Sequence, residues 1–318
     1  MARRRRTGKK LFKALLPILL VVVVAAVIAL AFIVYGITRP PRQAYFVTPQ
    51  SFSQISGSAL KVTDETWRNR DGSMARGWLL RGAEGAPSVV LLHRYGGDRS
   101  WLFNLGIKLN ETTNFTILWP DLRGHGLNPP VSATSFGSQE GDDLLAAMVF
   151  LRTLKGYSES PLVGEAVGVY GVELGAYVAL RAASSDASVK VLVLDSVPPD
   201  ADALVNASVI TDVGINNNVL LSLARLATRA YFLGHYENKS SCALAKSLTT
   251  QRVLLLAGAD NSSLRDSTSS LVQCFPNPAN QETKLDLPVT GLTLSSATGE
   301  QGENYDRPVI DFFNKNLH

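Results

Sequence analysis

Three short loops carry residues whose types and spacing could support nucleophilic catalysis, and each directly follows an apolar run. Their sequences are His93-Arg94-Tyr95-Gly96-Gly97-Asp98, Asp121-Leu122-Arg123-Gly124-His125-Gly126 and Gly171-Val172-Glu173-Leu174-Gly175. In the third loop, glycines lie two positions before and two positions after Glu173. A sharp strand-to-helix turn needs such glycines where its central side chain must be presented to a reactant. A carboxylate at that position could attack a substrate as a nucleophile.

The surrounding elements are predicted from hydrophobic periodicity. Five apolar runs rich in Val, Ile and Leu predict strands buried on both faces, at residues 88–92, 115–119, 167–170, 189–194 and 252–256. Helical spacing predicts helices over residues 139–154 and 174–183. Strands separated by helices indicate an α/β fold with a mostly parallel sheet covered on both faces. Residues 60–80 predict two antiparallel strands before it, and a last strand is expected at residues 282–287.

Taken together and in this order, the three loops resemble those of the α/β-hydrolase superfamily, closest to its membrane-anchored serine-hydrolase and S33-peptidase-like branch. The resemblance covers about residues 55–316. It implies an α/β-hydrolase fold and, in active relatives, hydrolysis of esters or amides by a Ser–His–Asp triad. The sequence has no cluster with metal-ligand spacing and no Walker or dinucleotide-binding loop, so no metal or other cofactor is expected.

The resemblance also identifies what the triad lacks. Glu173 stands at the position of the nucleophilic serine, and Leu292 stands where relatives carry the catalytic histidine in a Gly-His pair. Asp260 matches the acid position. No histidine lies between residues 282–287 and the final helix expected around residues 308–313. Without that base, no water or serine can be deprotonated in place, which predicts a degenerate triad.

The oxyanion loop departs from the family pattern as well. Arg94 occupies the place of a glycine that normally lets the backbone approach the substrate, while Tyr95 and Leu174 could still offer their backbone N–H groups. A carboxylate alone in a partly buried turn is unfavourable, and arginine suits carboxylate pairing. We therefore expect an ion pair between Arg94 and Glu173, with both side chains pointing to solvent as the alternative.

The N-terminal region predicts a membrane anchor. Residues 1–13 contain seven basic residues and no acidic one, and the segment from Ala14 to Tyr35 is apolar and uncharged. A bilayer core needs about 20 helical residues. We expect a basic cytoplasmic tail (1–13), a transmembrane helix (14–36), a stalk (37–54) and an extracytoplasmic domain (55–318). A cleaved signal peptide is the rival interpretation.

The net charge of +4 belongs to this leader rather than to the domain. Beyond residue 42 the chain has 22 basic and 27 acidic residues, a balance that argues against nucleic-acid binding. Cys242 and Cys274 lie in the expected extracytoplasmic part, where an oxidising compartment permits a disulfide between them. The sequence does not establish that the two are close.

Residues 196–251 form a helical excursion between the strands at 189–194 and 252–256. Within it, residues 218–233 place apolar side chains on one helical face: Val219, Leu220, Leu223, Leu226, Ala227, Ala230 and Tyr231. This face predicts either a helix packed on the sheet or a lid over a cleft at the carboxyl ends of the strands.

Two functions follow from these patterns. The first is a membrane-anchored pseudoenzyme of the α/β-hydrolase fold that acts by binding an unidentified ligand or protein. The second is an active ester or amide hydrolase with a non-standard site, using Glu173 together with His235 or His93. The missing base and the substitutions at positions 94 and 173 favour the first, because the members of a triad act as a unit.

Overall fold

A computed structural model describes residues 2–56 and 61–317. Within these residues, eight strands form one sheet in the order β1-β2-β4-β3-β5-β6-β7-β8. The strands are β1 (Val62–Arg68), β2 (Met74–Leu80), β3 (Ala86–Leu92), β4 (Thr116–Pro120), β5 (Val163–Val172), β6 (Val189–Asp195), β7 (Arg252–Gly258) and β8 (Gln281–Leu287). Only β2 runs antiparallel to its two neighbours, and β4, β3 and β5 to β8 are mutually parallel.

Helices cover both faces of the sheet, as the alternation of strands and helices predicts. The principal helices after the first strand are α3 (Phe103–Thr113), α4 (Glu140–Thr153), α5 (Leu174–Ser185), α8 (Ser241–Ala245), α9 (Ser262–Leu271) and α10 (Gly299–Asn316). Side chains of α4 and α5 join the apolar core on one face, while α3 and α10 join the core on the other. The central strands β3 and β5 to β7 are almost wholly buried because both of their faces are covered.

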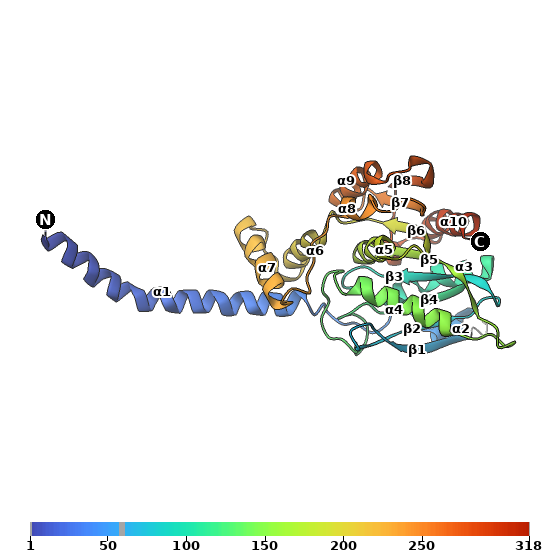
Figure 1. Cartoon of the computed structure of the whole chain (residues 1–318), viewed down its shortest axis with the longest axis horizontal. Helices are drawn as coiled ribbons and strands as arrows, with labels where there is room; N and C mark the ends of the chain where they lie inside the picture. Colours follow the sequence, from blue (N-terminus) through green and yellow to red (C-terminus); the bar gives the residue numbers. More distant parts are fainter. Residues whose placement is uncertain (1, 57–60, 318) are drawn as a thin grey trace.

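The helical excursion between β6 and β7 contains α6 (Ala201–Ser208), the π-helix η2 (Val209–Val213), α7 (Asn218–Tyr231) and α8. Helix α7 packs against α6 and α1. Its buried face consists of Leu221, Ala224 and Thr228. The apolar face expected to be buried is instead largely exposed, because the helix reaches out from the sheet beside the N-terminal helix (Figure 1).

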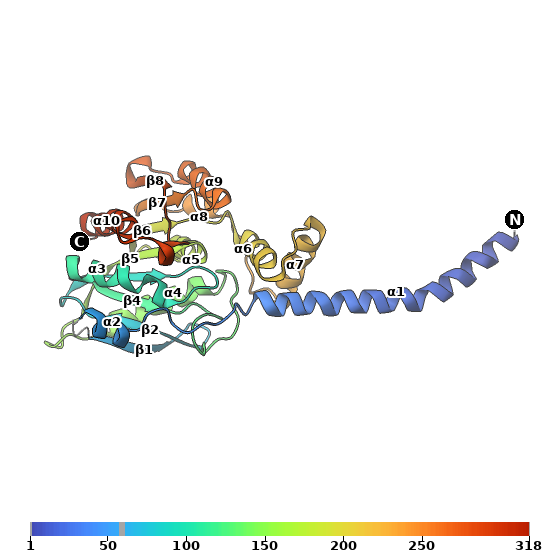
Figure 2. The same ribbon diagram turned by 180° about the vertical axis from the view of Figure 1, so that it is seen from behind.

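The N-terminal helix α1 (Ala2–Ile37) projects from the domain in both views (Figures 1 and 2). Its segment Leu15–Ile37 is long and apolar enough to cross a membrane, and almost none of it is buried against the rest of the chain. The region expected to be a stalk is not a free linker. Thr38 and Pro40 are buried, the Thr134 N–H donates to the Thr38 carbonyl oxygen at 2.9 Å, and α2 (Pro49–Ser56) follows.

Candidate active site

The loops after β3, β5, β6, β7 and β8 meet at the carboxyl ends of the parallel strands. Glu173 lies between β5 and α5 with φ 49° and ψ −105°, a left-handed conformation that is unusual for a non-glycine residue. The neighbouring glycines allow close packing. A Cβ on Gly171 would lie 2.3 Å from the backbone of Gly175, and a Cβ on Gly175 would lie 2.3 Å from the Leu92 carbonyl oxygen. The backbone thus forms a sharp elbow around Glu173.

The Glu173 carboxylate turns back onto the backbone groups expected to form an oxyanion hole. Its Oε2 accepts a hydrogen bond from the Tyr95 N–H at 3.1 Å. Burial raises the pKa of Glu173, whereas the nearby Arg94 charge and the Tyr95 and Leu174 amides act in the opposite direction. The Tyr95 and Leu174 amides therefore both act on an acceptor that is a side chain of the protein itself.

The expected ion pair between Arg94 and Glu173 does not form in the part of the chain that the structure describes. The Arg94 Nη1 donates to the Tyr95 carbonyl oxygen at 3.1 Å, and the guanidinium carbon lies 4.6 Å from the centre of the Trp101 ring. A planar guanidinium stacks well on an indole, and the amide of Tyr95 already serves the carboxylate. Arg94 thus acts on Glu173 only as a nearby charge.

The residue at the acid position is hydrogen-bonded to the loop after β8. Asp260, which follows β7, accepts hydrogen bonds at Oδ2 from the Thr290 N–H at 3.2 Å, the Thr290 hydroxyl at 2.6 Å and the Thr293 hydroxyl at 2.8 Å. Leu292 lies between these threonines and packs, partly buried, against the core on the α3 and α10 face. The structure therefore places Leu292 in the loop that Asp260 holds, where an isobutyl side chain can neither accept nor donate a proton.

A second carboxylate, which the sequence did not single out, lies beside the elbow. Asp195 ends β6 and is fully buried, and its backbone oxygen accepts the Glu173 N–H at 2.9 Å. Its side chain accepts from the Gly291 N–H at 2.6 Å, the Ser196 hydroxyl at 2.7 Å and the Tyr305 hydroxyl. Burial raises the Asp195 pKa to about 6 despite these donors. The only sequence signal was an acidic residue directly after the strand predicted at residues 189–194.

The histidines of the first two loops, His93 and His125, form hydrogen bonds with groups other than Glu173. The His93 Nε2 accepts the Leu122 N–H at 3.0 Å, and its Nδ1 donates to the Arg94 carbonyl oxygen at 2.8 Å. Burial lowers the pKa of His93 to about 4 and that of His125 to about 3, so both rings are neutral near pH 7. His235 is exposed and lines a separate surface groove that includes Arg70 and Asp142. None of these imidazoles donates to or accepts from Glu173 in the described structure.

Tyr95 also connects the elbow to the helices above it. Its hydroxyl lies 2.7 Å from the Ile37 carbonyl oxygen, at the end of α1, and 2.8 Å from Asp212 Oδ2 in η2. Its ring stacks on Phe136 with the ring centres 5.8 Å apart. The end of the N-terminal helix and the helical excursion therefore meet over the loop that carries the oxyanion donor.

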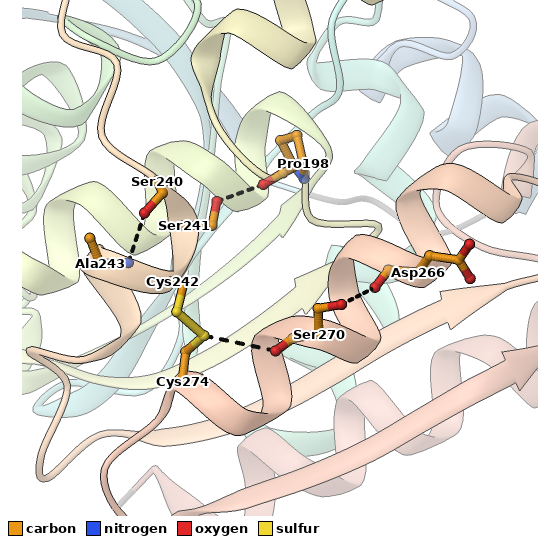
Figure 3. The surroundings of a disulfide bond; sticks show 8 residues. All are labelled: Pro198, Ser240, Ser241, Cys242, Ala243, Asp266, Ser270 and Cys274. Carbon is orange, nitrogen blue, oxygen red and sulfur yellow. Dashed lines mark hydrogen bonds between the residues drawn. A yellow bond between two sulfur atoms is a disulfide. The ribbon is translucent and has the colours of Figure 1, made fainter.

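The two cysteines are joined. Cys242 in α8 and Cys274, just after α9, form a disulfide across a sequence separation of 32 residues (Figure 3). In the same region the Ser241 hydroxyl donates to the Pro198 carbonyl oxygen at 2.6 Å. The bond therefore fastens the end of the helical excursion to the helix that follows β7, at some distance in sequence from the candidate site.

The chemistry that this arrangement can support is limited. The elbow presents a carboxylate, the Tyr95 and Leu174 amides are directed at that carboxylate, and the loop after β8 contains Leu292. Among the described residues, no group of three or more His, Cys, Asp or Glu residues is placed to hold a metal ion. Within these described residues, the Glu173 carboxylate accepts the Tyr95 N–H, and neither His93 nor His125 is hydrogen-bonded to it.

Comparisons with known proteins agree with this architecture. No protein-family model matches the chain, and no curated protein matches it. Its structure is similar to an esterase from Pyrococcus furiosus, with a TM-score of 0.67, 20% identity and coverage of 89% of this chain and 99% of that one. It is also similar to an α/β hydrolase from a Penicillium species (TM-score 0.60, 17% identity, coverage 81% and 99%) and an acetyl xylan esterase from a Paenibacillus species (0.55, 14%, 86% and 96%). The chain therefore has the α/β-hydrolase fold.

Proposed function

We propose that this protein is a membrane-anchored member of the α/β-hydrolase fold that lacks triad catalysis and acts by binding a ligand or a protein partner. The hydrogen bond from the Tyr95 N–H to Glu173 Oε2, at 3.1 Å, carries the proposal. Ester hydrolysis requires oxyanion donors that are free to receive the carbonyl oxygen of the substrate. Here the Glu173 carboxylate accepts the hydrogen bond of the Tyr95 N–H, and its negative charge would repel a developing oxyanion.

The loop after β8 supports the same function. Leu292 stands at the position of the base, and the carboxylate of Asp260 is engaged by Thr290 and Thr293. A triad loses most of its rate when one member is removed, because the members act together. A site with neither the nucleophilic hydroxyl nor the base is suited to binding rather than to turnover.

The alternative is an ester or amide hydrolase in which Glu173 is the nucleophile. The strained elbow favours it, since the carboxylate is presented where relatives hold their serine. Attack by the Glu173 carboxylate on an ester would break the bond between the acyl carbon and the alkoxy oxygen, leave a mixed anhydride on the enzyme and expel an alkoxide that takes a proton from water. Water would then have to be activated to clear it, and both ring nitrogens of His93 already have partners. The alternative therefore lacks a group that would activate this water.

The anchoring part of the proposal places residues 14–36 in a lipid bilayer, with the N-terminus cytoplasmic and the domain on the other side. Seven basic residues before the apolar segment support that orientation by the positive-inside rule. The bond between Cys242 and Cys274 supports it as well, because disulfides persist in oxidising compartments. A membrane-impermeant protease applied to intact cells should digest the domain; full protection of the domain would reverse the orientation.

Catalysis is tested with the full chain in detergent micelles and a short-chain p-nitrophenyl ester. We expect the wild-type protein, Glu173→Ala and Glu173→Ser all to release p-nitrophenol no faster than buffer. The double variant Glu173→Ser/Leu292→His restores a nucleophile and a base beside Asp260, and we expect it to gain measurable turnover. Thermal melts of all four proteins establish that each is folded.

Turnover by the wild-type protein that disappears in Glu173→Ala would overturn the proposal in favour of the carboxylate nucleophile. Trapping with hydroxylamine distinguishes the two cases further, since only an acylated Glu173 would yield a hydroxamate at that position.

A further inference from the structure

Helix α7 has two apolar faces, and only one of them is covered. Leu221, Ala224 and Thr228 are buried against the rest of the protein. A second set, which we name the outer face, consists of Val219, Leu223 and Leu226, with exposures of 69%, 42% and 63%. Their spacing of four and three residues places them together on one side of the helix. Three large aliphatic side chains are therefore presented outward from a single helix.

Exposed apolar residues also flank α7 on both sides in the sequence. Ile210 and Val213 in η2 are 39% and 37% exposed, and Leu233, just after α7, is 85% exposed. The sequence of α7 contains two basic residues, Arg225 and Arg229, and no acidic one. An amphipathic helix with large apolar residues on one side and arginines on another is typical of segments that lie in a membrane interface.

Helix α7 lies beside the end of the apolar span of α1. The span Leu15–Ile37 has 23 residues, which corresponds to about 35 Å of helix against a hydrocarbon core of about 30 Å. Residues from Leu15 to Ala29 are exposed, whereas Val34 and Ile37 are buried against the domain. Helix α7 packs beside this last part of α1, and the Arg39 Nη2 donates to the Tyr231 hydroxyl at 3.1 Å.

Both views place α7 alongside α1 on the side away from the sheet, toward the part of α1 that extends from the domain (Figures 1 and 2). We propose that the outer face of α7 is inserted in the lipid leaflet where the span of α1 ends, as a second membrane contact. The inference rests on α1 spanning a bilayer, which is part of the proposed function. Lipid is the occupant because three large aliphatic side chains are exposed on a helix that packs against the apolar span and carries arginines but no acidic residue.

The contact would fix the orientation of the domain. A single helix leaves a domain free to rotate about its anchor, whereas two contacts hold one surface toward the membrane. That surface includes the helices that lie over Tyr95, because the Tyr95 hydroxyl contacts both Ile37 at the end of α1 and Asp212 in η2. The candidate site at Glu173 would consequently be held on the membrane side of the domain.

Nitroxide spin labels test this contact in the full chain, reconstituted in phosphatidylcholine nanodiscs. Single cysteines are introduced as Leu226→Cys, as Val24→Cys in the middle of the span, and as Tyr157→Cys, whose native side chain is 92% exposed on a loop between α4 and β5. Cys242 and Cys274 are bonded to each other and will not take the label. Collision of each label with oxygen, which concentrates in lipid, is compared with collision with a water-soluble nickel chelate.

We expect the oxygen-to-nickel collision ratio to be high at position 24, low at position 157, and at position 226 several-fold above that at position 157. A water-like ratio at position 226 with a lipid-like ratio at position 24 would overturn the inference and leave the anchor intact. Shielding of position 226 from both reagents would overturn it too, because a protein would then cover the outer face. A water-like ratio at position 24 would instead refute the anchoring itself.

Discussion

Two carboxylates lie at the ends of neighbouring strands, and their surroundings differ. Asp195, at the end of β6, is fully buried and receives hydrogen bonds from Gly291, Ser196 and Tyr305. Glu173, after β5, is partly exposed, and its carboxylate is held by backbone amides of its own and the adjacent loop. The Asp195 side chain links β6 to α10 and to the loop after β8, whereas the Glu173 side chain links its own turn to the loop after β3.

The difference teaches where the stability of this edge of the sheet resides. The close backbone packing at the elbow depends on Gly171 and Gly175 rather than on the side chain between them. The loop after β8 keeps its place through Asp195 and Asp260. We therefore expect substitutions at position 173 to leave the fold intact, whereas removal of the carboxylate at position 195 should destabilise it.

The largest effect is expected for Asp195→Ala. The substitution leaves the Gly291 N–H and the Tyr305 hydroxyl buried without their acceptor, which should lower the free energy of unfolding by about 3–5 kcal/mol. Urea unfolding of the full chain in detergent, followed by tryptophan fluorescence, measures it. Asp260→Ala is the matched control, because Asp260 also accepts three hydrogen bonds but is exposed, so its loss should be about 1 kcal/mol or less. Equal losses would erase the distinction between a buried and an exposed carboxylate.

A pH series sharpens the same comparison. The pKa of Asp195 is raised by burial from 3.8 to about 6, so the folded state holds its proton more tightly than the unfolded state. The contribution of this proton to the free energy of unfolding is therefore complete below about pH 4. It is lost as the pH rises through about 6, and the free energy of unfolding decreases by about 3 kcal/mol. Asp195→Asn removes this titration.

The free energy of unfolding of Asp195→Asn, relative to the wild-type protein, should consequently increase by that amount between pH 4 and pH 7. His93 and His125 titrate in the opposite sense, with pKa values lowered to about 4 and about 3 by burial. Both histidines are present in the variant and in the wild-type protein, so their titration cancels in the difference between the two free energies of unfolding. A difference that stays flat across the range would mean that Asp195 titrates as an exposed carboxyl does.

The fold was predictable because its signals are local. Apolar runs predicted strands at residues 189–194 and 252–256. The structure has these strands at Val189–Asp195 and Arg252–Gly258, longer than predicted only at their ends. The strand expected at residues 167–170 extends in the structure over Val163–Val172. The prediction was too short because Gly164 and Glu165 interrupt the apolar run. The glycines around Glu173 likewise predicted a sharp turn, since backbone clearance depends on nearby residues.

The contacts that define the candidate site were harder to predict because they join distant positions. The Tyr305 hydroxyl reaches Asp195 across 110 residues, and nothing in either segment indicates the partner. The expected pairing of Arg94 with Glu173 was wrong because Trp101, only seven positions from Arg94, offers the guanidinium an aromatic face. In α7, periodicity identified apolar residues but could not tell that Leu221 faces the protein and Leu226 faces outward.

The smallest effect is expected for Glu173→Gln. The amide oxygen can still accept the Tyr95 N–H, and the substitution removes a charge whose burial is unfavourable. Because the pKa of Glu173 is raised in the folded state, its charge becomes increasingly destabilising as the pH rises. The variant should therefore be as stable as the wild-type protein at acidic pH and more stable at neutral pH, by about 1 kcal/mol or less. Thermal melts at pH 4 and pH 7 measure the change, with Glu300→Gln in the exposed first turn of α10 as the control. A loss of stability at neutral pH would show that the ionised carboxylate is itself a structural element, and the two carboxylates would then differ in degree rather than in kind.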